Sequence, residues 1–145
     1  DYLNIKENCK LQLAIKSQKI DKTLFIKHYD YLISYLNLEK VQSQSVYKLS
    51  MGQKQRALIL KCLITYPDLI LADEPTSFQD ANMKKKVIDL LISFTKRENS
   101  KLIMVSHDHE IKSYFENVIS FDELINFTKK DIKNDIHFSE KKITT

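Results

Sequence analysis

Glycine is almost absent from this sequence, which has Gly52 alone among 145 residues. Average usage is about 7%, so a typical chain of this length would have about ten glycines. Glycine-rich phosphate loops and dinucleotide-binding turns both need several glycines close together. The sequence therefore contains neither kind of loop. Its length fits one domain, and its 43% hydrophobic and 29% charged residues are typical of a folded protein.

Arginine and cysteine are also scarce, and no long apolar run is present. Arg56 and Arg97 are the only arginines, and the net charge of +4 comes from lysines spread along the chain. Because specific clamping of nucleic acids favours arginine, no nucleic-acid partner is expected. Cys9 and Cys62 lack the spacing of a zinc or redox pair, which favours a reducing, cytoplasmic location. Charged residues interrupt the most apolar stretch, 58–72, so no membrane span is predicted.

Apolar spacing divides the chain into a helical first part and an alternating second part. The predicted helices are 8–16, 22–37, 51–65 and 81–97. Short apolar runs at 69–72 and 102–105 predict strands that are covered on both faces. Strand, helix, strand is the repeating unit of a parallel sheet. The predicted fold class is therefore α/β, with a parallel sheet flanked by helices and an N-terminal helical subdomain.

The end of the chain is less apolar. A helix is predicted near 110–116 and a third short strand at 118–121, before a lysine-rich polar segment. The predicted organisation is a helical portion over 1–49, a core portion over 50–128 and a polar tail over 129–145.

Asp73 and Glu74 directly follow the first apolar run, where the carboxyl end of a buried strand is expected. Ligands of open α/β sheets bind at such strand ends. Asp73 could hold Mg²⁺, which takes oxygen ligands, while Glu74 could polarise an attacking water. A strand-terminating turn helped by Pro75, with two exposed acids, is the alternative for this pair taken alone.

Ser50 and Gln53 have the spacing of a capping box at the start of the predicted helix 51–65. A purely structural cap explains this local pattern. The same helix start also presents free N–H groups and a positive dipole end, which favour an anion such as phosphate. Gly52 in the first turn indicates that another group approaches this backbone closely.

His107 follows the second apolar run and stands with Asp108 and His109. Two histidines and one acid in three residues rarely build a zinc site, which needs three or four ligands. His28 and His137 have no partners in the sequence and receive no role. His107 is therefore the histidine that the strand order brings towards the acids, although a structural role is more common for a histidine in isolation.

Four short motifs occur in fixed order, namely LSMGQKQR at 49–56, LILADEPT at 69–76, SFQD at 77–80 and VSHD at 105–108. Together they resemble the ATP-binding subunit of ABC transporters, a P-loop NTPase. In that family they correspond to the signature motif, the Walker B strand, the D-loop and the switch histidine. The segment 4–13 also resembles the opening of the family's helical subdomain.

The resemblance implies a role for each motif residue. Ser50, Gly52 and Gln53 would contact the γ-phosphate of an ATP held mainly by the opposite subunit of a head-to-tail dimer. Asp73 would serve Mg²⁺, and Glu74 would activate the hydrolytic water. His107 would contact the γ-phosphate, and Asp80 would transmit the nucleotide state across the dimer interface. Membrane permease subunits would complete the transporter at the inner face of the membrane.

Three departures from the family pattern are visible. Met51 replaces the first glycine of LSGGQ, and the D-loop reads SFQD instead of SALD. The GxxxxGK[ST] loop that holds the β- and γ-phosphates is missing, as is the Q-loop glutamine. The chain begins with Asp1 and has no leader, so we expect the numbering to start inside a longer gene product. The chain alone is expected to be inactive and to bind ATP weakly.

The leading hypothesis is an ATPase subunit of an ABC transporter, and the LADEPT form is most similar to the lipoprotein-release and macrolide- or peptide-export branch. A shortened, non-catalytic remnant that supplies only the signature face is the second hypothesis. A soluble ABC-type ATPase that acts on ribosomes or DNA is the third. It is disfavoured, because the sequence has no long heptad repeats or arginine-rich arms.

Overall fold

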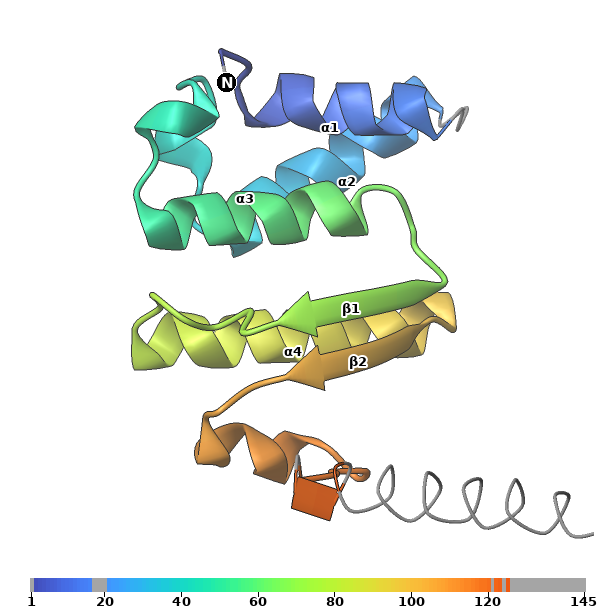
Figure 1. Cartoon of the computed structure of the whole chain (residues 1–145). Helices are drawn as coiled ribbons and strands as arrows, with labels where there is room; N and C mark the ends of the chain where they lie inside the picture. Colours follow the sequence, from blue (N-terminus) through green and yellow to red (C-terminus); the bar gives the residue numbers. More distant parts are fainter. Residues whose placement is uncertain (1, 17–20, 121, 124, 126–145) are drawn as a thin grey trace, which may run out of the picture. The chain divides into compact units, whose positions relative to one another are not determined.

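The computed structural model describes residues 2–16, 21–120, 122, 123 and 125 (Figure 1). By its contacts the chain divides into two compact units, Asp1–His109 and Glu110–Thr145. The elements of the first unit are α1 (Ile5–Ile15), α2 (Lys22–Tyr35), α3 (Met51–Leu63), β1 (Leu69–Asp73), α4 (Ala81–Glu98) and β2 (Lys101–Val105). Short 3-10 helices occur at Glu39–Val41 and Val46–Lys48, and a third, His109–Tyr114, follows β2. In the described part of the chain, no helix is both long and apolar enough to cross a membrane.

Local capping explains where the first helices begin. Asn4 and Glu7 form a capping box, with 3.0 Å from the Glu7 N–H to Asn4 Oδ1 and 2.8 Å from the Asn4 N–H to Glu7 Oε2. Helix α1 therefore begins at Ile5, three residues before the predicted start. Asp21 caps α2 by accepting hydrogen bonds from the first-turn backbone. Both N-terminal helices are confirmed.

The sheet consists of β1 and β2, which pair in parallel with Leu69 opposite Lys101 and Asp73 opposite Val105. Helix α4 connects them, as a parallel pair requires. The predicted α/β class, with a parallel sheet and flanking helices, is confirmed. Ile70 is buried, and Ala72, Leu102 and Met104 pack against the same core.

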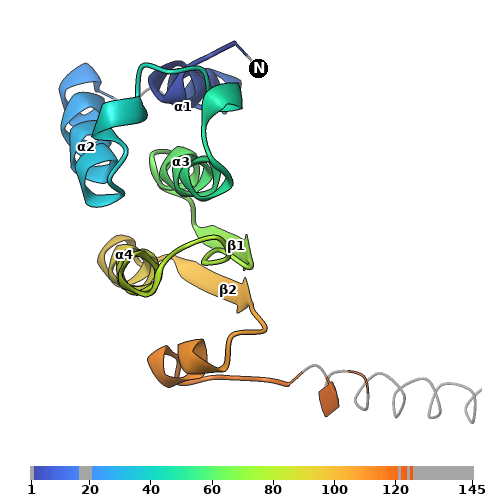
Figure 2. The ribbon, with the colours of Figure 1, turned by 90° about the vertical axis from the view of Figure 1, so that its left-hand side faces the viewer.

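Within the described residues the opposite face of the sheet is bare, so the prediction of strands covered on both faces is wrong for this structure. Leu71 is 72% exposed, and Leu69, Ile103 and Val105 are also exposed. Figure 2 shows α4 along one side of the two strands. Because side chains alternate along a strand, a single covering helix buries only every second residue.

The hydrophobic core joins the helical part to the strands. It is one cluster that includes Tyr29 of α2, Leu60 of α3, Ile70 of β1 and Phe94 of α4. Packing of this kind, and not helix propensity, supplies most of the stability of such short helices.

The segment after β2 departs from the predictions made for it. The helix expected near 110–116 is observed as the 3-10 helix His109–Tyr114. Residues 118–120 of the expected strand are not in a strand, and Val118 and Ile119 are exposed. A strand needs a hydrogen-bonded neighbour, and the sheet in the described residues pairs β1 with β2 only. Phe121 and the predicted polar tail 129–145 lie outside the described residues, and the predicted divisions at residues 49 and 128 stay predictions.

Candidate functional site

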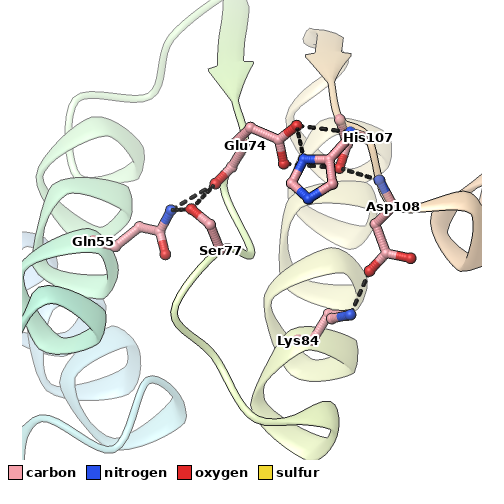
Figure 3. Close-up of polar contacts among 7 residues, drawn as sticks. Gln55, Glu74, Ser77, Lys84, His107 and Asp108 are labelled. Atoms are coloured by element: carbon pink, nitrogen blue, oxygen red, sulfur yellow. Dashed lines mark hydrogen bonds and ion pairs between the residues drawn. The ribbon is translucent and has the colours of Figure 1, made fainter.

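The carboxyl ends of β1 and β2 bring the predicted acid and histidine together (Figure 3). The Glu74 N–H donates to the carbonyl of Val105 at 2.9 Å, which extends the pairing one residue past the sheet. Glu74 has φ 45°, a left-handed backbone conformation that is uncommon for a residue with a side chain. Such strain occurs preferentially at functional positions.

The Glu74 carboxylate accepts three hydrogen bonds from the segment after β2. The His107 N–H lies 2.7 Å and His107 Nδ1 2.6 Å from Oε1, and Ser106 Oγ lies 3.1 Å from Oε2. Burial by itself raises the pKa of Glu74, but the bonds from His107 and Ser106 together lower it below the ordinary glutamate value. Glu74 is therefore ionised at neutral pH.

This geometry fixes the orientation of the His107 ring. An ionised carboxylate only accepts hydrogen bonds, so Nδ1 carries a proton and donates it to Glu74. The rest of the ring is directed to solvent, since the His107 side chain is 85% exposed. Lys84 of α4 forms an ion pair with Asp108, and the Asp108 N–H donates to Ser106 Oγ at 3.2 Å. The two contacts hold the segment that carries His107.

The start of α3 forms the capping box that the sequence predicts. The Ser50 N–H donates to Gln53 Oε1 at 2.9 Å, and the Gln53 N–H donates to Ser50 Oγ at 3.3 Å. The structural interpretation of this pair is confirmed. Its second role, in binding phosphate, stays a prediction.

The backbone of Gly52 is closely approached by another part of the chain. A Cβ atom built on Gly52 would lie 2.6 Å from the carbonyl oxygen of Phe78 and 3.3 Å from Gln79 Nε2. Real Cβ atoms essentially never come this close to backbone, so glycine is required here. The predicted close approach is confirmed, and the approaching group is the turn after β1 of the same chain.

Sequence reasoning missed Gln55, which connects α3 to this turn. Its Nε2 donates to the carbonyl of Glu74 at 2.6 Å and to Ser77 Oγ at 3.0 Å. Gln55 stands inside the 49–56 motif, but nothing in its spacing indicates a partner 19 residues away. Helix α3, through Gln55, is thus in direct contact with the backbone carbonyl of the candidate catalytic glutamate, Glu74.

A known protein family matches about half of the chain. The model of the family described as "ABC transporter" matches residues 3–77, which include α3, β1 and the Asp73–Glu74 pair.

The chain belongs to the ABC transporter family.

Two curated ABC relatives illustrate the match. The lipoprotein-releasing system ATP-binding protein LolD of Neorickettsia sennetsu is 42% identical over 106 residues, which are 73% of this chain and 46% of LolD. The probable ABC transporter ATP-binding protein p29 of Mesomycoplasma hyorhinis is 38% identical over 119 residues, or 82% of this chain and 44% of p29. The chain thus spans about half the length of the curated relatives it matches.

A solved ABC cassette has the same fold. The dimeric structure of the bacterial ABC transporter cassette MJ0796 matches with a TM-score of 0.69 and 28% identity. The match covers 79% of this chain and 50% of the cassette. The fold is therefore that of about half of an ABC ATPase cassette, a P-loop NTPase.

Asp73 is suited to a divalent cation in this ABC chain. Its side chain is exposed at the end of β1, and it has no hydrogen-bond or ion-pair partner within the described residues. Those residues contain no group of three or more His, Cys, Asp or Glu side chains that could hold a metal. Mg²⁺ is commonly held by one or two carboxylates together with substrate phosphates and waters. A single carboxylate such as Asp73 fits a site in which substrate phosphates and waters are the other Mg²⁺ ligands.

Asp80, the predicted D-loop aspartate of the ABC pattern, caps α4. Its Oδ1 accepts from the Met83 N–H at 2.9 Å, and the residue is exposed. A capping contact of this kind accounts for the aspartate without a partner chain. Its predicted role at a dimer interface stays a prediction.

Proposed function

We propose that this chain is part of the ATP-hydrolysing subunit of an ABC transporter. The observation that carries the proposal is the hydrogen-bonded pair of Glu74 and His107, at the ends of adjacent parallel strands in a chain of this family. The complete subunit works as a head-to-tail dimer on membrane permease subunits, at the cytoplasmic face. The glycine-rich loop that wraps the ATP phosphates is supplied by residues outside the 145 in this sequence.

In the proposed reaction Glu74 is the general base. Its lowered pKa keeps the carboxylate ionised, and His107 holds it through Oε1. A water on Glu74 attacks the γ-phosphorus, gives its proton to the carboxylate and forms the new P–O bond. The bond to the bridging oxygen breaks, and ADP leaves with that oxygen. The exposed part of the His107 ring contacts the γ-phosphate oxygens.

Mg²⁺ fits beside Asp73 and, when bound, neutralises charge on the phosphate oxygens. The exposed Asp73 carboxylate needs no rearrangement to face a ligand, because no contact in the described residues ties it down. In this proposal Asp73 orients the nucleotide, and Glu74 accepts the proton of the attacking water.

The start of α3 serves the ATP of the opposite subunit in this proposal. Ser50 Oγ accepts within the capping box, so its hydroxyl proton is available for a phosphate oxygen. Gln53 uses its oxygen in the box, so its NH₂ group is available too. Gly52 adds backbone at the positive end of the helix dipole. Asp80, on the adjoining turn, transmits the nucleotide state across the interface.

We further propose that the transporter belongs to the export branch. The LADEPT sequence at 71–76 supports this assignment, as does the 42% identity to a lipoprotein-releasing ATP-binding protein. An importer subunit also matches, but at lower identity: the taurine import ATP-binding protein of Roseobacter denitrificans is 31% identical to this chain.

The test is Glu74→Gln in the intact protein. The amide keeps the shape of the side chain but cannot take a proton, so steady-state ATP hydrolysis should fall by about 10²- to 10⁴-fold while ATP binding is retained. The exposed Glu116→Gln is the matched control and should keep wild-type turnover. Unchanged hydrolysis in Glu74→Gln, or no hydrolysis in the wild type, would refute the proposal. The chain of 145 residues alone should bind Mg-ATP weakly in calorimetry.

A further inference from the structure

Gln79 lies on the turn between β1 and α4 and makes three side-chain hydrogen bonds to α3. Its Nε2 donates to the Gly52 carbonyl at 3.0 Å and to Gln55 Oε1 at 3.1 Å. Its Oε1 accepts from Arg56 Nη1 at 2.5 Å. No motif role that the resemblance implies uses Gln79, and the family's usual SALD sequence has leucine at this position.

The bonds have a fixed direction. Gln55 Nε2 is held by two acceptors, because Ser77 Oγ donates its own proton to the Glu74 carbonyl at 2.9 Å and accepts from Gln55. The oxygen of Gln55 must then face Gln79, whose NH₂ group donates to it. That leaves the oxygen of Gln79 for Arg56. A directed chain of hydrogen bonds therefore runs from Arg56 through Gln79 and Gln55 to the backbone of Glu74.

Two features make this chain of hydrogen bonds important for the turn. The turn is strained, since Glu74 has φ 45° and Phe78 φ 62°, and strained backbone persists only when surrounding contacts hold it. Arg56 is partly buried, and burial lowers its pKa without neutralising a guanidinium. Its bond to Gln79 is thus charge-assisted and among the stronger contacts of the site.

We propose that Gln79 is a positioning residue for Glu74, holding the strained turn against α3 so that the carboxylate stays aligned with His107. The proposal deepens the proposed function, because it couples the start of α3, which faces the partner's nucleotide, to the general base. Leucine has a similar size but neither donates nor accepts, so it cannot make this coupling.

The first test is amide hydrogen exchange on the intact protein with Gln79→Leu. Loss of three hydrogen bonds should accelerate exchange of the Ser77 and Gln79 amides about tenfold, from the usual worth of such bonds. The decisive amide is that of His107, which bonds to Glu74 and has no bond to Gln79. It should also exchange about tenfold faster if Glu74 loses its alignment. Gln42→Leu removes a bond only to the Glu39 carbonyl and should leave all three unchanged.

The second test asks whether Gln79 acts through Gln55. In a double-mutant cycle, Gln55→Leu with Gln79→Leu should accelerate His107 exchange by less than the product of the two single effects, because the bond between Gln79 and Gln55 is broken in both single variants. Multiplied effects, or a His107 amide that does not respond to Gln79→Leu, would overturn the proposal. Gln79→Glu keeps an acceptor for Arg56 and loses both donated bonds. It should show the same His107 effect, which covers the case in which the leucine variant does not fold.

Kinetics supply the readout that a merely structural role would not move. Gln79→Leu should lower kcat for ATP hydrolysis about tenfold and leave KM for ATP unchanged, because Gln79 aligns the base and does not touch the nucleotide. Unchanged kcat beside altered exchange would refute positioning. A wild-type protein without ATPase activity would refute the proposed function, whereas the exchange data would still decide whether Gln79 holds Glu74.

Discussion

Replacing Gly52 by alanine is the sharpest test of the contact between α3 and the turn after β1. The new Cβ would lie 2.6 Å from the Phe78 carbonyl oxygen. The oxygen belongs to backbone that already has φ 62°, so it cannot move away cheaply. Overpacking of this kind costs about 1–3 kcal/mol, and loss of the bond from Gln79 adds about 0.5–1.5 kcal/mol. Alanine regains about 1 kcal/mol of helix propensity.

The net expectation is a loss of roughly 1–3 kcal/mol in the free energy of unfolding, or a Tm lower by roughly 3–10 °C. Thermal melting followed by circular dichroism measures it. Met51→Ala, one residue earlier and 57% exposed, should change stability by less than about 0.5 kcal/mol. A Gly52→Ala protein as stable as the wild type would show that the turn leaves room for a Cβ atom at residue 52, and the reasoning about Gly52 would fail.

Two further predictions concern the core and the sheet. His28 is buried beside Tyr66 and Phe94, and its ring nitrogens have no hydrogen-bond partner in the described residues. Burial, with Arg97 nearby, lowers its pKa below 6.5, although Glu98 opposes the shift. His28 therefore binds a proton at a higher pH in the unfolded chain than in the folded protein. The free energy of unfolding should decline as the pH falls below 6.5 and level off below the pKa of His28 in the folded protein. His28→Leu should flatten that slope in chemical denaturation, whereas the exposed His109→Gln should preserve it. The bare sheet face predicts self-association of the chain, which Leu71→Lys should reduce in sedimentation velocity; a wild-type chain that is monomeric at every concentration would contradict this.

Local signals predicted the helices well and their ends less well. Periodic apolar residues indicated α2, but the helix ends at Tyr35, because Asn37 adopts φ 52° and breaks the helical backbone. Leu24 and Tyr31, two large side chains within the predicted helix 22–37, are exposed, so spacing identified the helix but not the full extent of its buried face. The capping box at Ser50 was predictable, because its partners are three residues apart.

The candidate site was predictable only in its parts. Strand order and the positions of Asp73, Glu74 and His107 placed the acids and the histidine at one sheet edge, since parallel strands end together. The bond between Glu74 and His107 spans 33 residues, and its geometry depends on the left-handed turn at Glu74, which no local preference of glutamate predicts.

The sequence by itself determined the α/β class, the parallel pair of strands, the capped start of α3 and the resemblance to ABC ATPases, because each follows from local spacing or from the order of elements and motifs along the chain. Only the tertiary structure decided which sheet face is bare, what presses on Gly52, and how Gln79 and Gln55 tie α3 to Glu74. These contacts join residues 19 to 27 positions apart. Their existence depends on how whole elements pack, and periodicity along the chain carries no information about that.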